Sequence, residues 1–271
     1  SRDVANLTGF NIDNMVGELH LDSTVFRDSR GVYVMRHFDA SIENDKYMSR
    51  RINLNNDFFD FEMMGKINFA NLVKSFNEYG DSFVHIPVFH KNLDEFRKYK
   101  IKNEVEQDFV LSLSLKDTKT VSRLLMPNLR IAKNTTIGAT FSSKSKQMTL
   151  TARSKSVKIG DLNINNIELK SSNAPNAMIG TLSIGELAWV NMSKTDTVSY
   201  GVDNFVMTTR FGGDSIASRI RWDDQSEDDH NKGMIEARFY PHESGGIFTV
   251  KEADITIHDS LWQTSPNNYV D

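Results

Sequence analysis

Hydrophobic and polar residues alternate along most of the chain. The alternation is cleanest over residues 109–115, which read FVLSLSL, and it recurs over 59–69 with an interruption at Gly65. Further alternating runs follow at intervals of about 8–12 residues as far as Ile257. A period of two residues is typical of β-strands that have one apolar face. The chain is therefore predicted to be mainly β.

Two segments have the helical period instead. The first is a helix predicted over about residues 68–79, where the apolar residues from Phe69 to Phe76 follow i, i+3, i+4, i+7 spacing and an asparagine stands in the N-cap position. The second is predicted to begin at Asp117 and to end before Pro127, because proline cannot continue a helix.

A charged stretch over residues 91–108 separates two β-rich parts of the chain. We interpret it as a connecting helix or linker, which leaves a β segment over 1–90 and a repetitive β segment over 109–271. The first residues have the character of the end of a strand. We therefore expect the chain to be one part of a longer protein.

A six-residue pattern recurs in which the apolar positions shift by one at a polar pair. It occurs at 10–15 (FNIDNM), 162–167 (LNINNI) and 200–205 (YGVDNF), with looser copies at 182–189 and 248–255. Such a shift turns later side chains to the other face of the sheet unless a bulge absorbs one extra residue. Asp and Asn tolerate left-handed backbone, so we expect each strand to bend there and keep both arms facing inward.

Bent strands stacked side by side form a trough with a continuous apolar lining. The predicted fold is thus mainly β, a bent-strand trough with one to three short helices. Ordinary bulges in a closed β-sandwich are the alternative that this pattern leaves open. The inward apolar positions are the candidate lining of the groove: Phe109, Leu111, Leu113, Leu115, Ile164, Ile167, Leu169, Leu182, Ile184, Leu187, Val202, Phe205 and Met207.

Composition and charge exclude several classes of function. The chain has 271 residues and no cysteine, which excludes disulfide scaffolds, thiolate metal sites and cysteine nucleophiles. Its 32 basic and 36 acidic residues are interspersed and give a net charge of −4, so nucleic acid is not an expected partner. No apolar run reaches the 18 residues of a membrane-spanning helix, and the first residues lack the features of a signal peptide.

No motif in the sequence nominates a catalytic centre, a metal or a cofactor. The acidic run 223–229 beside His230 lacks the alternating ligands and the glycine of a calcium loop and is interpreted as a solvated hairpin loop. His85 and His90 would face opposite sides of a strand and could not share a metal. There is no serine nucleophile elbow and no phosphate-binding glycine loop. We expect the protein not to be an enzyme.

Two further groups of residues are interpreted as surface or packing positions. The basic residues of the first group alternate with apolar ones and are expected on the solvated face of two hairpins, and the tryptophans of the second group are expected in the core or at its rim. The two groups are Lys144, Lys146, Arg153, Lys155 and Lys158, and Trp189, Trp222 and Trp262.

Residues 6–19 (NLTGFNIDNMVGEL) and 162–169 resemble the recurring strand phrase of the TamB branch of the AsmA-like proteins, and 110–149 is similar to that family's strand, short helix and strand-rich continuation. The resemblance implies a folded, trough-like sheet called a β-taco. It also implies a periplasmic segment of an inner-membrane-anchored envelope protein of Gram-negative bacteria. Such proteins act in phospholipid movement to the outer membrane and in outer-membrane protein assembly with a BamA-like partner of the TamA type.

Three hypotheses of function follow from these observations. The leading one is a non-enzymatic groove for phospholipid or other acyl chains, because each methylene costs about 0.8 kcal/mol to expose to water and a continuous apolar lining removes most of that cost. The second is a chaperone-like β-edge platform for outer-membrane proteins. The third is a carbohydrate-binding β-rich module, which requires acidic or tryptophan side chains clustered on one face.

Overall fold

A computed structural model describes most of the chain. The described residues run from 4 to 270 and leave out 10, 29–30, 46–48, 85–105, 117, 120–121, 123–125, 127, 193–196, 225–230, 243–244, 258–259 and 265–267.

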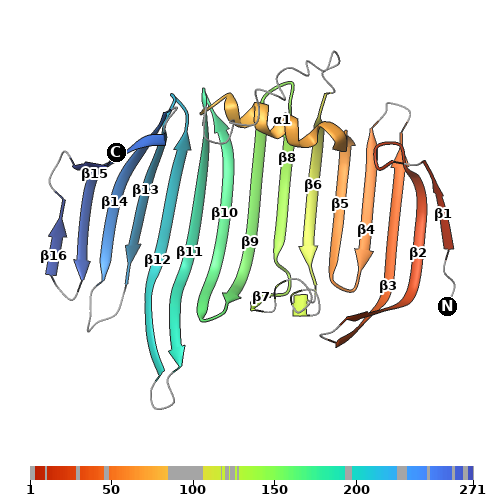
Figure 1. Cartoon of the computed structure of the whole chain (residues 1–271), viewed down its shortest axis with the longest axis horizontal. Helices are drawn as coiled ribbons and strands as arrows, with labels where there is room; N and C mark the ends of the chain where they lie inside the picture. The colour runs from red at the N-terminus through yellow and green to blue at the C-terminus, as the bar shows by residue number, and fades with distance from the viewer. Residues whose placement is uncertain are drawn as a thin grey trace.

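The described residues form one antiparallel sheet and one helix of several turns (Figure 1). Strands pair mainly with their neighbours in sequence, except that β6 pairs with β8, while β7 and β17 add to β9 and β15. This confirms the predicted mainly β fold. The strands are β1 (Val4–Thr8), β2 (Val16–Asp28), β3 (Gly31–Asn44), β4 (Arg50–Asn56), β5 (Phe59–Lys66), β6 (Asp108–Leu115), β7 (Leu129–Ile131), β8 (Thr136–Ser142), β9 (Gln147–Ile159), β10 (Leu162–Ala174), β11 (Ala177–Met192), β12 (Thr197–Phe211), β13 (Ile216–Asp223), β14 (Lys232–His242), β15 (Gly245–Ile257), β16 (Ser260–Gln263) and β17 (Asn268–Val270).

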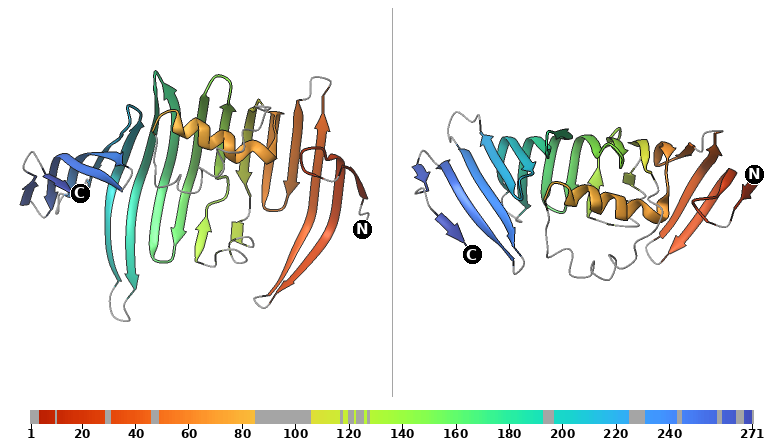
Figure 2. Two further views of the ribbon diagram at one scale, coloured as in Figure 1. Left: turned by 45° about the horizontal axis from the view of Figure 1, so that its top comes forward. Right: turned by 90° about the horizontal axis from the view of Figure 1, so that it is seen from above.

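The sheet is open and curved. Seen from above, both of its ends bend toward the side on which the helix lies (Figure 2). The described strands belong to a single sheet, so the closed sandwich left open by the sequence is not found among them. The curvature agrees with the predicted trough.

The helix α1 (Phe69–Asp81) runs across strands β5 to β10, close to one end of these strands (Figure 1). It matches the helix predicted over 68–79. Asn68 is its N-cap, as expected, and its side chain accepts a hydrogen bond from the backbone N–H of Asn71 at 3.0 Å. Its apolar face covers a cluster on the sheet that includes Met63, Phe109 and Phe141.

The second predicted helix and the linker fall mostly outside the described residues. Thr118, Lys119 and Ser122 are helical, and the N–H of Met126 donates to the carbonyl of Ser122 at 2.8 Å, as in a helix. The linker lies outside the described residues up to position 105, and β6 begins at Asp108. Since β5 pairs with β6 along its whole length, the β segments on both sides of the linker belong to the same sheet.

The predicted bend lies at one level in three neighbouring strands. Asn166 in β10 and Asn204 in β12 have left-handed backbone, with φ of 53° and 50°, as expected for asparagine. Gly185 of β11 lies between them, and a Cβ there would come within 2.9 Å of the Cβ of Asn166. The expected extra residue is absent, because the pairing of β10 with β11 has the same register on both sides of the bend. Neighbouring strands that bend together need no insertion.

The other copies of the pattern differ. In β15 the register shifts opposite Glu236 and Ala237, so Lys251 is an inserted residue and this copy is a β-bulge. The copy at 10–15 was predicted to be a bent strand. This prediction is wrong, because its residues 11–14 form the turn between β1 and β2. The carbonyl of Asn11 accepts hydrogen bonds from the N–H groups of Asn14 and Met15 there. The same polar residues can therefore close a turn instead of bending a strand.

Candidate functional site

An unbroken row of apolar residues crosses the sheet, and we call it the apolar row. Each member lies directly opposite the next in the strand register, so all of them are on one face. With neighbouring strands about 4.8 Å apart, the row is about 60 Å long along the sheet. It runs from β1 to β15, with β7 alone outside it, through Ala5, Leu19, Ala40, Leu54, Phe61, Leu113, Ile137, Ala152, Leu169, Leu182, Met207, Ile220, Ile235 and Ala253.

The opposite face of the sheet is mainly polar. The residues next to the apolar row form a second row in register, in which Thr136, Arg153, Glu168 and Ser183 lie opposite one another. Arg153 Nε and Lys170 Nζ contact the carboxylate of Glu168 at 2.7 and 2.6 Å. The hydrogen bond from Lys170, followed by that from Arg153, holds the pKa of Glu168 below its ordinary value. The sheet therefore has one hydrated face and one apolar face.

Helix α1 covers part of the apolar face. Phe76 of the helix packs on Phe109 and Phe141, with ring centroids 6.4 and 4.6 Å apart, and the two sheet residues are only 4% and 2% exposed. Ile42, Ile52 and Met63 also belong to the sheet side of this cluster. Strands β3 to β9 beneath and beside the helix are called the helix-covered half.

Both ends of α1 are tied to the sheet side of the molecule. The carboxylate of Asp13, in the turn after β1, accepts hydrogen bonds from the N–H groups of Phe69 and Ala70 at 2.5 and 3.1 Å. At the other end the hydroxyl of Tyr79 donates to Oδ1 of Asn173 in β10 at 3.1 Å. Burial raises the pKa of Tyr79, so this hydroxyl is protonated at neutral pH. The helix is therefore fixed across the strands at both ends.

Strands β10 to β15 form the uncovered half. At its border, Asn173 accepts the hydrogen bond from Tyr79 of the helix and Met178 packs against the buried cluster. Among its described apolar residues, Ile184, at 7% exposed, is the one side chain larger than alanine that is fully buried. The remaining large apolar residues of the inner rows are half-buried against their cross-strand neighbours. This half presents an apolar surface that no second layer of the described chain covers.

The structure brings the predicted lining residues together in consecutive rows. Four of them belong to the apolar row. Three form the next row, which lies between the apolar row and the bend, and three form a row on the other side of the bend. All of these are buried or half-buried. The three sets are Leu113, Leu169, Leu182 and Met207; Ile167, Ile184 and Phe205; and Ile164, Leu187 and Val202.

The remaining three predicted lining residues are on β6. Phe109 and Leu111 lie in or against the cluster beneath α1, where the helix occupies the space next to them. Leu115 pairs with Phe59 at the end of β5 and is half-buried. The helix thus fills one side of the predicted groove in the helix-covered half, and the apolar row passes beside it.

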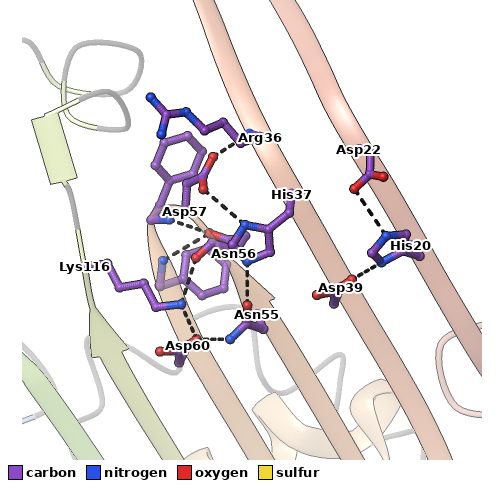
Figure 3. Close-up of polar contacts among 12 residues, drawn as sticks. His20, Asp22, Arg36, His37, Asp39, Asn55, Asn56, Asp57, Asp60 and Lys116 are labelled. Atoms are coloured by element: carbon purple, nitrogen blue, oxygen red, sulfur yellow. Dashed lines mark hydrogen bonds and ion pairs between the residues drawn. The ribbon is translucent and has the colours of Figure 1, made fainter. Parts of the chain in front are cut away.

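A histidine–aspartate square on the polar face is a feature that the sequence analysis missed. His20 lies opposite Asp39, and Asp22 lies opposite His37 (Figure 3). His20 contacts Asp39 through Nδ1 and Asp22 through Nε2, the latter at 3.2 Å. The hydrogen bond with Asp39 raises the pKa of His20 above its usual value. The signal in the sequence is a His-x-Asp triplet repeated in two adjacent strands, because antiparallel pairing sets each histidine against an aspartate.

His37 continues this network across the next strands. Its Nε2 lies 2.7 Å from Oδ1 of Asn55 and its Nδ1 lies 3.2 Å from Oδ1 of Asp57 (Figure 3). Asn55 in turn donates to Asp60 at 2.5 Å, and Lys116 Nζ contacts Asp60 at 2.6 Å. The partners of both imidazoles in the described chain are carboxylate and amide oxygens. The arrangement supports ion pairing between strands and supplies no activated nucleophile.

The structure describes only part of the acidic run and of the histidines that the sequence offered as candidate ligands. Of the acidic run only Asp223 and Asp224 are described, and His85 and His90 lie outside the described residues. Within the described part of the chain no three acidic or histidine side chains converge as metal ligands, and no helix has the length and apolarity to cross a membrane. Trp189 and Trp262 are 54% and 64% exposed, not packed in a core.

Comparisons with known proteins do not assign the chain to a family. No protein-family model matches it, and neither a curated protein nor a solved structure is significantly similar to it. The two faces of the sheet are therefore the features from which a function can be inferred.

Proposed function

We propose that the protein binds the acyl chains of phospholipids along the apolar face of its sheet and acts as a non-enzymatic segment of a lipid-carrying groove. The observation that carries this proposal is the apolar row, which continues from strand to strand without a polar residue. A single buried core would not require a row of this length, because a core is limited to the area that a second layer covers.

The energetics support a lipid ligand in particular. Each methylene moved from water to an apolar surface contributes about 0.8 kcal/mol, so an acyl chain gains on the order of 10 kcal/mol from full burial. Half-buried residues such as Leu182, Met207 and Ile220 retain apolar area that such a chain can cover. A ligand that moves along the row meets the same surface in every strand, so no strand holds it much more tightly than the next.

The resemblance to TamB and other AsmA-like proteins supplies the proposed setting. In this proposal the chain is a periplasmic segment of an inner-membrane-anchored envelope protein, which passes phospholipid toward the outer membrane and contributes to outer-membrane protein assembly with a BamA-like partner of the TamA type. The open, bent sheet supports it, since a β-taco-like segment needs an apolar face left free by its own chain.

The test compares two neighbouring positions on opposite faces of β11. Leu182→Glu places a charge in the apolar row, and Ser183→Glu places the same charge on the polar face. We expect Leu182→Glu to weaken binding of a fluorescent fatty acid at least about tenfold and to remove co-purified phospholipid in native mass spectrometry, because the carboxylate cannot be desolvated against an acyl chain. Ser183→Glu should bind as the wild type does. Equal binding by both variants would reject the proposal.

A second candidate function rests on the edge strand β1. All of its residues are exposed, including Val4 at 46% and Leu7 at 39%, and in the described sheet it pairs with β2 alone. Such an edge can add a strand of another chain. Crosslinks from β1 to unfolded outer-membrane proteins, with no fatty-acid binding by the sheet, would favour this chaperone-like function over lipid transport.

A further inference from the structure

A cavity with a volume of ≈ 450 Å³ lies beyond the bend, between β7 and the arms of β9 to β11. Its size is within the range of about 300–1,000 Å³ that is usual for small-molecule sites. Lys158 and Asn163, which line it, are opposite each other in the register of β9 and β10. Since Ile164 follows Asn163 in the strand, the cavity opens on the face opposite to the row of Ile164. Its lining residues are distinct from those of the apolar row.

Two positive charges meet at this cavity. Arg130 of β7 lies directly opposite Lys158 of β9, and both line it. Directly opposed like charges destabilise a strand pair, because their Cβ atoms are only about 4.5–5.5 Å apart. Neither side chain has a carboxylate partner within the described chain. This costs folding free energy unless an anion lies between the two charges.

The other lining residues suit a phosphate ester. The hydroxyl of Ser156 and the amide of Asn163 supply further donors, and Ala188 and Val190 supply an apolar wall for the esterified group. Glu186 is the one carboxylate among the described lining residues. It lies on β11, two strands from Lys158, and accepts a hydrogen bond from Nδ2 of Asn165 at 2.8 Å.

We propose that Arg130 and Lys158, with Ser156 and Asn163 beside them, bind the phosphate group of a phosphate-bearing anion. Guanidinium and ammonium groups are the usual phosphate ligands, and a phosphate between the two charges turns their repulsion into attraction. The residues of this site are distinct from those of the apolar row, so its test does not depend on acyl-chain binding. The phosphate belongs either to a soluble ester or to a lipid headgroup, and the experiment distinguishes the two sources.

The experiment compares the wild-type chain with Arg130→Gln/Lys158→Gln and with the control Arg210→Gln/Lys144→Gln. The control removes the same two charges from exposed positions outside the cavity. Inorganic phosphate and a short-chain alkyl phosphate are titrated by calorimetry, and vesicles of phosphatidylglycerol are tested by flotation. Thermal unfolding is followed with and without phosphate.

We expect the cavity variant to lose at least about tenfold in affinity for the phosphate probe, while the control binds normally. Phosphate should raise the unfolding temperature of the wild type and of the control only. Without phosphate the cavity variant should unfold no earlier than the wild type, because the repulsion is gone. If the cavity variant loses binding to vesicles only, the site is assigned to a lipid headgroup. If it loses binding of the soluble phosphate probes, the site is assigned to a free ester. Equal binding by the cavity variant and the control in both assays would overturn the proposal.

Discussion

The two halves of the sheet have the same alternating strand pattern, but they differ in how far their apolar face is buried. In the helix-covered half the part of the apolar face beneath α1 is sealed, with Ile52, Met63 and Phe141 at most 5% exposed. In the uncovered half no such layer is present in the described chain, and apolar residues such as Leu182 and Met207 are half-buried. One chain thus contains a conventional core and an open apolar surface side by side.

The difference between the halves comes from the second layer. An apolar sheet face becomes a dry core only where another element packs on it. Here that element is α1, whose aromatic residue Phe76 reaches Phe109 and Phe141. Stability is therefore concentrated in the helix-covered half, and the area left free for a ligand is concentrated in the uncovered half. The following predictions test this division.

The largest expected effect is the loss of a core aromatic residue. Phe141→Ala should lower the free energy of unfolding by about 3–5 kcal/mol, because it leaves a cavity beneath α1. Phe205→Ala in the uncovered half should cost only about 1–2 kcal/mol, since its half-buried ring loses less contact. Urea unfolding of both variants measures the difference. Equal losses would mean that the two halves are packed alike.

The bend of the uncovered half should resist a side chain at Gly185. Gly185→Ala places a Cβ within 2.9 Å of the Cβ of Asn166, and we expect a loss of about 1–3 kcal/mol from overpacking. Gly180→Ala on the same strand is the control, because a Cβ there meets nothing within 4 Å. If both variants unfold at the same urea concentration, the close approach at the bend does not affect the free energy of unfolding.

The attachment of α1 should respond to a smaller change. Tyr79→Phe removes the hydroxyl that donates to Asn173 and should cost about 0.5–1.5 kcal/mol. Hydrogen exchange should speed up in the last turn of α1 and remain as in the wild type in β12 to β15. Faster exchange throughout the sheet would contradict the view that the helix stabilises one half only.

The smallest expected effect is the pH response of the histidine–aspartate square. The pKa of His20 is raised in the folded state, chiefly by its hydrogen bond with Asp39. Its contribution to stability is therefore fully present below the unfolded pKa of 6.5 and is lost as the pH rises through the folded pKa. The unfolding temperature should fall slightly over this range in the wild type and less in His20→Asn. An equal slope in the two proteins would exclude His20 as the source.

Much of the fold could be predicted from local patterns. The period of two residues predicted the strands, and the spacing from Phe69 to Phe76 predicted α1 within two residues at its C-terminal end. The preference of asparagine for left-handed backbone predicted the bends at Asn166 and Asn204. Each of these features depends on residues close together in the chain, which is why the sequence reveals them.

Other features depend on partners that lie far apart in the chain. The turn at residues 11–14 has the same letters as a bent strand, and it is closed by its own hydrogen bonds and by Arg50, which donates to the carbonyls of Ile12 and Met15. The histidine–aspartate square and the opposed charges of Arg130 and Lys158 arise only from strand register. No local pattern contains that register.

By itself, the sequence determined that apolar residues occupy one face of many strands, since side chains alternate along any extended chain. Only the tertiary structure decided that these faces align into one row across the sheet, and that α1 covers the apolar face beside this row in one half of the sheet and leaves the other half open. The physical reason is that alternation is a property of each strand, whereas alignment and coverage depend on register and on the position of a helix that packs across several strands.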